Sequence, residues 1–172
     1  MTRLPAPPAE VPVQRSLDGL APQFRAAVER VVARMRNDGH LPTVFETLRT
    51  EQRQSFIYGF GREYDDGRGI VTHSESAVDT WHGYGLAVDI ICGVRLWGAR
   101  PDFWASLGTA CRAEGLVWGA DWNNNGRTDD ERFVDRPHVQ WGNGMRRSPS
   151  SRAVKLQADG GNEAVWQAVG AA

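Results

Sequence analysis

The spacing of hydrophobic residues along the chain predicts a mixed α+β domain. Between residues 20 and 35, apolar side chains recur every three or four positions, which indicates an amphipathic helix that ends near 37–39. Further helices are predicted over 51–60 and 101–114, the latter beginning at Pro101 and closed by Gly115. We therefore expect an α+β fold, with helices flanking a small antiparallel sheet. Runs of β-branched and aliphatic residues predict its strands over 42–46, 86–91, 116–118 and 138–141.

A chain of 172 residues is long enough for one ordinary domain, which we place at residues 17–145. Residues 1–16 contain four prolines and few apolar anchors, so we expect an extended and poorly ordered arm. Residues 146–172 form a C-terminal extension. A single apolar stripe within it predicts a short docked helix.

The overall charge excludes some partners. The formal net charge is −1 and the basic residues are scattered, which disfavours nucleic acid and anionic membranes. No apolar run approaches the roughly 18 residues of a membrane-spanning helix, and the N-terminal segment lacks the apolar core of a secretory signal. The two cysteines, Cys92 and Cys111, are expected to be buried thiols rather than a disulfide.

Two compact motifs carry the candidate chemistry. His82 and Asp89 lie in the sequence HGYGLAVD, and His138 ends the sequence DRPH. Two imidazoles and one carboxylate suit a catalytic zinc ion, because three protein ligands leave a fourth position open for water. Asp135, three residues before His138, is placed to act as general base and acid. Each residue alone is more often an ordinary core or turn residue. However, two of only four histidines fall in such motifs, and this combination favours the metal site.

A second candidate metal site lies in residues 121–131. Oxygen-bearing side chains occupy positions 1, 3 and 5, and a glycine at position 6 allows the sharp turn of a calcium loop. Position 12 is Arg132 instead of the glutamate of an EF-hand, so two acidic residues just before it would have to close the shell. An Asx-rich surface turn that binds no ion is the alternative. The predicted calcium ligands are Asp121, Asn123, Asn125, the Arg127 carbonyl, Asp130 and Glu131.

Three segments in order resemble the signature of one peptidase family. They are TLRTEQ over 47–52, WHGYGLAVD over 81–89 and DRPH over 135–138. This pattern resembles the D-Ala-D-Ala carboxypeptidase and L-alanyl-D-glutamate endopeptidase family, which includes vancomycin-resistance D,D-peptidases and phage endolysins. The resemblance implies a zinc ion on the three ligands, Asp135 as catalytic acid and base, and Arg49 as a substrate-facing cation. A guanidinium suits that role because it pairs with carboxylates, although Arg49 alone would be taken as a surface arginine at a helix start.

The resemblance also directs the functional prediction. It implies a zinc endopeptidase that cuts the L-alanyl-D-glutamate bond of the peptidoglycan stem peptide, and we expect the protein to be a monomer. The loop at 121–131 resembles that of calcium-regulated endolysins, which implies calcium control. Cleavage of terminal D-Ala-D-Ala is the runner-up activity, and a non-catalytic wall-binding module is the alternative from another class. Without a signal segment, the enzyme would act on the wall after phage-type release.

Overall fold

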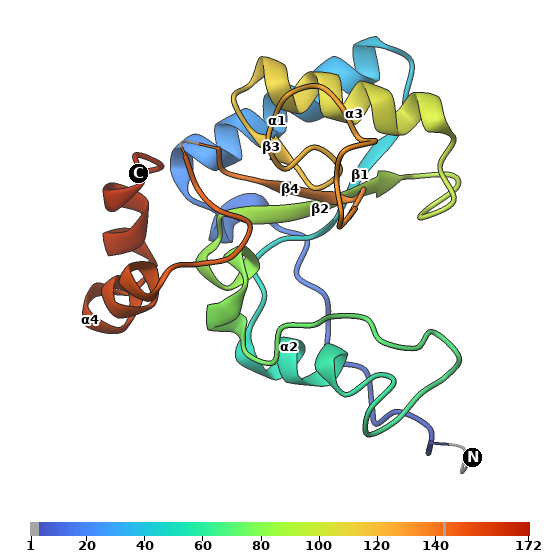
Figure 1. Ribbon diagram of the computed structural model, residues 1–172, viewed down its shortest axis with the longest axis vertical. Helices are drawn as coiled ribbons and strands as arrows, with labels where there is room; N and C mark the ends of the chain where they lie inside the picture. Colours follow the sequence, from blue (N-terminus) through green and yellow to red (C-terminus); the bar gives the residue numbers. More distant parts are fainter. Residues whose placement is uncertain (1–3, 143) are drawn as a thin grey trace.

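A four-stranded antiparallel sheet forms the centre of the computed structural model, which describes residues 4–142 and 144–172 (Figure 1). Residues 1–3 of the predicted arm and residue 143 of the predicted domain lie outside this description. Helices α1 and α3 cover one side of the sheet, and α2 lies on the other side. The α+β prediction is confirmed. The strands, in the spatial order β1-β2-β4-β3, are β1 (Pro42–Glu46), β2 (Ala87–Cys92), β4 (His138–Gln140) and β3 (Val117–Trp118).

The strand register brings polar residues from distant segments side by side. Asp89 on β2 pairs with His138 on β4, and Glu46 on β1 pairs with the same aspartate after an irregularity at Val44/Glu46. Side chains alternate between the two faces of a strand. Val88 and Ile90 enter the apolar core, so Asp89 faces the opposite side. One face of the sheet is therefore apolar, and the other carries the polar cluster.

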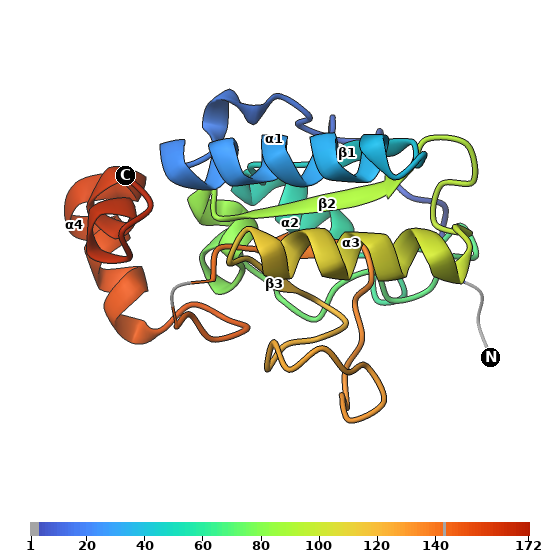
Figure 2. The same ribbon diagram turned by 90° about the horizontal axis from the view of Figure 1, so that it is seen from above.

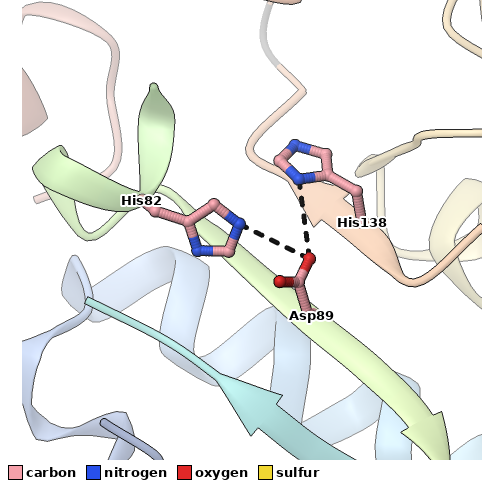
Figure 3. A group of neighbouring side chains, drawn as sticks. All are labelled: His82, Asp89 and His138. Atoms are coloured by element: carbon pink, nitrogen blue, oxygen red, sulfur yellow. Dashed lines mark ion pairs between the residues drawn. The ribbon is translucent and has the colours of Figure 1, made fainter. Parts of the chain in front are cut away.

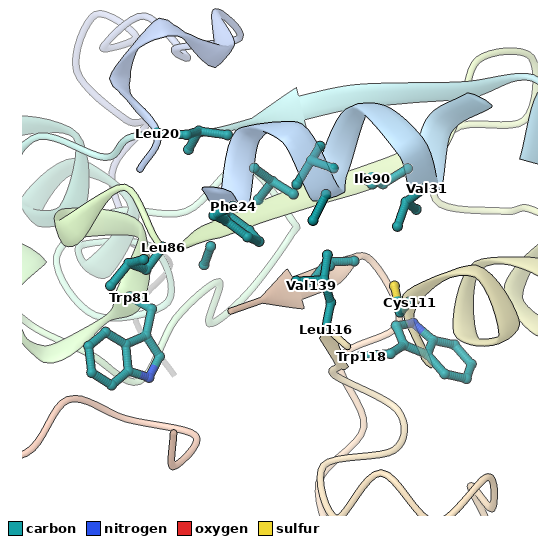
Figure 4. Close-up of a cluster of buried hydrophobic side chains, with 14 of the residues drawn as sticks. Leu20, Phe24, Val31, Trp81, Leu86, Ile90, Cys111, Leu116, Trp118 and Val139 are labelled. Atoms are coloured by element: carbon teal, nitrogen blue, oxygen red, sulfur yellow. The ribbon is translucent and has the colours of Figure 1, made fainter. Parts of the chain in front are cut away.

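The apolar face is covered by α1 (Pro22–Asn37) and α3 (Pro101–Ala113), which run beside each other over the strands (Figures 1 and 2). Burial of these apolar side chains is the main stabilising contribution to the domain. The predicted helical spacing is confirmed, because the positions that repeat every three or four residues are the buried ones. The core drawn in Figure 4 includes Phe24, Val31, Leu86, Ile90, Leu116 and Val139.

On the polar side, α2 (Glu51–Tyr58) begins at Thr50, whose side chain accepts a hydrogen bond from the Arg53 amide. The helix packs through Phe56 and Ile57, part of a small apolar cluster that also contacts Val11 from the N-terminal arm. The rest of the arm is anchored as well, since Thr47 donates its amide hydrogen to the Gln14 carbonyl at 2.9 Å. Residues 4–16 thus lie against β1 and α2.

The C-terminal extension forms α4 (Ser151–Ala168), which stands at one end of the sheet (Figures 1 and 2). The Ser150 side chain caps its first turn by accepting from the Ala153 amide, and Gly161 interrupts it with a positive φ of 71°. The segment therefore consists of two helical stretches joined at Gly161, and the second contains the predicted apolar stripe, in which Val165 is buried.

Cys111 is buried and Cys92 is partly buried, and both are free thiols, as expected. Over residues 4–142 and 144–172, no helix combines the length and apolar character needed to cross a bilayer.

Candidate metal centre and its groove

His82 lies in a 3-10 turn, η3 (Trp81–Tyr84), that leads directly into β2. Gly85 ends the turn in the left-handed conformation with a φ of 65°, which glycine adopts without strain. Gly83 is required for a different reason, because a Cβ atom there would lie 2.1 Å from the Ala77 carbonyl oxygen. The glycines of HGYG thus allow the chain to fold His82 back over the strand that carries Asp89.

Helix α4 holds this turn from outside. The side chains of Gln157 and Asn162 each donate a hydrogen bond to the Gly83 carbonyl at 3.3 Å. The Trp166 indole donates to the Tyr84 carbonyl at 2.6 Å. Residues 146–172 therefore stabilise the segment that presents His82, a role that the sequence did not indicate.

The three predicted ligands converge (Figure 3). Asp89 Oδ1 lies 3.5 Å from His82 Nε2 and 3.8 Å from His138 Nδ1, and the candidate ligand atoms all fall within 4.8 Å of one another. Ligands of a tetrahedral zinc ion lie about 3.3 Å apart when metal–ligand distances are about 2.0–2.1 Å. The spacing and the donor set of two imidazoles and a carboxylate fit zinc.

Both histidine rings are oriented by hydrogen bonds on their far nitrogens. His82 Nδ1 lies 2.9 Å from the Thr47 carbonyl oxygen, so it carries the proton and leaves Nε2 with its lone pair toward Asp89. His138 Nε2 lies 3.1 Å from Gln140 Oε1, which leaves Nδ1 toward Asp89. The Gln140 amide is held in turn, because it donates to the Arg146 carbonyl at 3.0 Å. Outer hydrogen bonds of this kind fix ring tautomer and orientation in metal sites.

The electrostatics favour the protonation states that metal ligands need. Burial by itself would raise the pKa of Asp89, but the neighbouring His82, Arg49 and His138 side chains hold it below its ordinary value. Burial, reinforced by the His82 charge, lowers the pKa of His138 to about 4. At neutral pH Asp89 is therefore anionic and His138 is neutral, and both are ready to bind a cation.

Asp135 lies in the same groove as the three ligands. Its backbone is fixed by Gly119, whose carbonyl accepts the Asp135 amide hydrogen at 2.7 Å. Burial and then the charge of Asp89 raise the pKa of the Asp135 carboxyl to about 6. A carboxyl group with a pKa near neutrality can both take up and release a proton, which general acid–base catalysis requires.

Arg49 also reaches the site, but its guanidinium group is already engaged. Its Nε donates to Glu46 at 3.1 Å and its Nη1 to Gln54 at 3.1 Å, while Nη2 lies 3.5 Å from Asp89 Oδ2. Arg53 donates to the other oxygen of Glu46 at 2.9 Å, so the buried Glu46 carboxylate balances two cations. Sequence reasoning missed Glu46, Gln54 and Gln140. The only available signal was the two-residue spacing that puts Gln140 on the same strand face as His138.

The predicted calcium loop is closed by its own hydrogen bonds. Asp121 is buried and accepts from the amides of Asn125 and Gly126, each at 2.9 Å, and from the Arg112 guanidinium at 3.1 Å. The Asn123 and Asn125 side-chain amides both donate to Asp130, at 3.3 and 2.7 Å.

The last two predicted calcium ligands are tied into the same loop. Glu131 accepts from the Asn123 amide at 3.2 Å. Arg127 donates its amide hydrogen to the Asn125 side chain at 2.8 Å, and its guanidinium pairs with Asp129. The six predicted ligands thus gather in one loop, although no three carboxylates of the described residues meet there.

The groove around the metal centre has a volume of about 960 Å³, at the upper end of the range usual for ligand pockets. Its outer wall contains Trp122, whose ring packs 5.4 Å from the His138 ring and 6.2 Å from the Phe133 ring. The Trp122 indole is fixed by donating to the Phe133 carbonyl at 2.8 Å. Such a groove is large enough for a short peptide.

Comparison with known proteins agrees with this architecture. No protein-family model matches the sequence. Over 130 residues the chain is 24% identical to the L-alanyl-D-glutamate peptidase of Listeria phage A118, a region that covers 73% of the chain and 39% of the phage protein. The chain thus spans about two fifths of the length of this curated relative.

Two solved structures share the fold. VanYB in complex with D-alanine-D-alanine superposes with a TM-score of 0.51 at 16% identity, over 93% of the chain and 91% of that protein. The vancomycin-resistance D,D-pentapeptidase VanY in complex with Zn(II) superposes with a TM-score of 0.50 at 16% identity, over 95% of the chain and 97% of that protein. These likenesses show that the chain has a VanY-like fold, and its three sequence segments resemble the signature of the D-Ala-D-Ala carboxypeptidase and L-alanyl-D-glutamate endopeptidase family.

Proposed function

We propose that the protein is a zinc-dependent peptidoglycan endopeptidase that hydrolyses the L-alanyl-D-glutamate bond of the stem peptide. The observation that carries this proposal is the convergence of His82, Asp89 and His138 in a groove that also contains Asp135. The likeness to a phage L-alanyl-D-glutamate peptidase supports the choice of bond. The protein would act as a monomer on the cell wall after phage-type release.

Each residue has a distinct part in the proposed reaction. A bound zinc ion would polarise the scissile carbonyl and make water a better nucleophile. Asp135, with its pKa raised to about 6, would accept the proton of the attacking water and pass it to the leaving amine. Arg49 would contact the substrate at the metal end of the groove, where Glu46 and Gln54 hold its guanidinium.

The broken bond is identified by mass spectrometry of purified cell walls after digestion. We expect a new amino terminus at D-glutamate or its amidated form. Loss of only a terminal D-alanine would instead identify a D-Ala-D-Ala carboxypeptidase, the activity suggested by the ligand of the VanYB structure. Wall binding without release of any amine would identify a non-catalytic binding module.

We further propose that calcium binds the loop at 121–131 and promotes catalysis. The side-chain amides of Asn123 and Asn125 lie beside Asp130, to which their nitrogens donate. If these amides turned, their oxygens would join the Asp130 carboxylate as hard ligands of the kind that suit calcium. Trp122 provides the link to the metal centre, because it belongs to the loop and packs on the His138 ring. Calcium would have to compete with the loop's own hydrogen bonds and with the Arg112–Asp121 ion pair.

This second proposal is tested at constant zinc. Protein stripped of calcium on a chelating resin and resupplied with zinc should gain activity as calcium is added, and calorimetry should detect the binding. Equal turnover with and without calcium would contradict calcium regulation.

A further inference from the structure

Four arginines line the groove, and they differ in what balances their charge. Arg49 and Arg53 both donate to the buried Glu46. Arg68 pairs with Asp66. Arg147 is exposed and makes no ion pair with any acidic residue among 4–142 and 144–172. One cation at the groove therefore keeps its charge available for a ligand.

Aromatic rings hold Arg147 in place. Its guanidinium carbon lies 4.9 Å from the centre of the Phe133 ring and 5.9 Å from that of Trp122. Cation–π contacts of this kind orient a guanidinium while leaving its N–H edge free to donate. Trp122 itself packs on the His138 ring, so a single aromatic ring separates the guanidinium from a metal ligand.

We propose that Arg147 is a specificity-determining residue that binds a carboxylate of the substrate next to the scissile bond. This inference rests on the proposed function. In a stem peptide joined through the glutamyl side chain, the glutamyl α-carboxylate remains free beside the bond to be cut. A guanidinium pairs with a carboxylate through two parallel hydrogen bonds, whereas a carboxamide lacks both the charge and the second acceptor. Arg49 is less suited to this task because Glu46 already balances its charge.

The test compares two ligands that differ only in this group. One is a ketomethylene analogue of an L-alanyl-γ-D-glutamyl peptide, which cannot be hydrolysed, and the other carries a carboxamide in place of the α-carboxylate. Calorimetry on the zinc-loaded protein should show about tenfold or more tighter binding of the carboxylate, because hydrogen bonds between two charged groups are stronger than those to a neutral amide. Arg147→Ala should remove this preference and leave affinity for the carboxamide unchanged, while Arg147→Lys should restore part of it.

Arg152→Ala is the matched control, since it removes the same charge from an exposed position on α4 outside the groove. It should retain the full preference. An unchanged preference in Arg147→Ala, or no preference in the unmodified protein, would overturn the inference. Carboxylate preference without wall hydrolysis would instead reject the proposed function, and hydrolysis without the preference would reject only the role of Arg147.

Discussion

The metal centre and the loop at 121–131 both gather metal-binding side chains, but they are held in different ways. At the metal centre, His82 is oriented by the Thr47 carbonyl from a distant segment, and His138 by Gln140 on the same strand, whose amide donates in turn to the Arg146 carbonyl. In the loop, Asn123, Asn125 and Asp130 are held mainly by one another. A site supported by distant elements is organised before its ion arrives, whereas a self-supported loop must exchange its own hydrogen bonds for ligand bonds.

Loss of one metal ligand should have the largest effect. His138→Ala removes one of three protein ligands, so we expect zinc to be lost and wall hydrolysis to fall below detection. Elemental analysis measures the bound zinc, and the release of amino groups from purified walls measures hydrolysis. Stoichiometric zinc in an inactive variant would mean that His138 is not a ligand.

Removal of the proposed proton carrier should separate metal binding from chemistry. Asp135→Ala should retain zinc but lose about 10²- to 10⁴-fold in kcat, the usual contribution of general acid–base catalysis. Elemental analysis combined with initial rates measures this. Near-normal turnover would remove Asp135 from the mechanism.

The outer support of the metal centre is tested at Gln140. Gln140→Ala leaves His138 Nε2 without its acceptor, and we expect about 10- to 100-fold weaker zinc affinity. Competition with a zinc-binding dye gives the affinity. An unchanged zinc affinity would mean that the Gln140 side chain does not support the metal centre.

The raised pKa of Asp135 predicts a pH effect on the zinc-free protein. The pKa of this carboxyl is about 6 in the fold and 3.8 in the unfolded chain, so the folded state holds the extra proton between these values. Its contribution to stability is present at low pH and is lost as pH rises through 3.8 to 6.

Asp135→Asn removes this ionisation and should therefore stabilise the zinc-free protein near pH 7. We expect a gain of about 1 kcal/mol in the free energy of unfolding, which is less than the full pKa difference implies because Asp135 is only partly buried. Urea unfolding at pH 4 and pH 7 measures the difference. If the difference in unfolding free energy between Asp135→Asn and the unmodified protein does not grow with pH, the pKa of Asp135 is not raised in the fold.

The smallest effect is expected in the loop. Asp130→Asn should abolish the response to calcium while changing calcium-free turnover less than about threefold, because an exposed loop residue contributes little to the fold by itself. Calcium titration at fixed zinc checks this. A large loss of calcium-free activity would show that the loop supports the metal centre without an ion.

The candidate site itself was largely predictable from the sequence. The candidate ligands lie in short motifs whose glycines and strand spacing are local features, and the structure brings His82, Asp89 and His138 together, while their binding of zinc stays a prediction. The roles of Asp135 and Arg49 stay predictions. The network around Arg49 was not predictable, because nothing local to Glu46 indicates that the register pairs it with Asp89.

The sequence by itself determined the helices, the strands and the motifs of the candidate metal ligands, because hydrophobic periodicity and turn glycines act over a few residues. The tertiary structure alone decided what surrounds them. Contacts between distant segments placed the Thr47 carbonyl behind His82, α4 against the Gly83 carbonyl and Arg147 over the aromatic wall of the groove. Such contacts depend on the sheet register and on how helices pack, and these are set by burial across the whole domain.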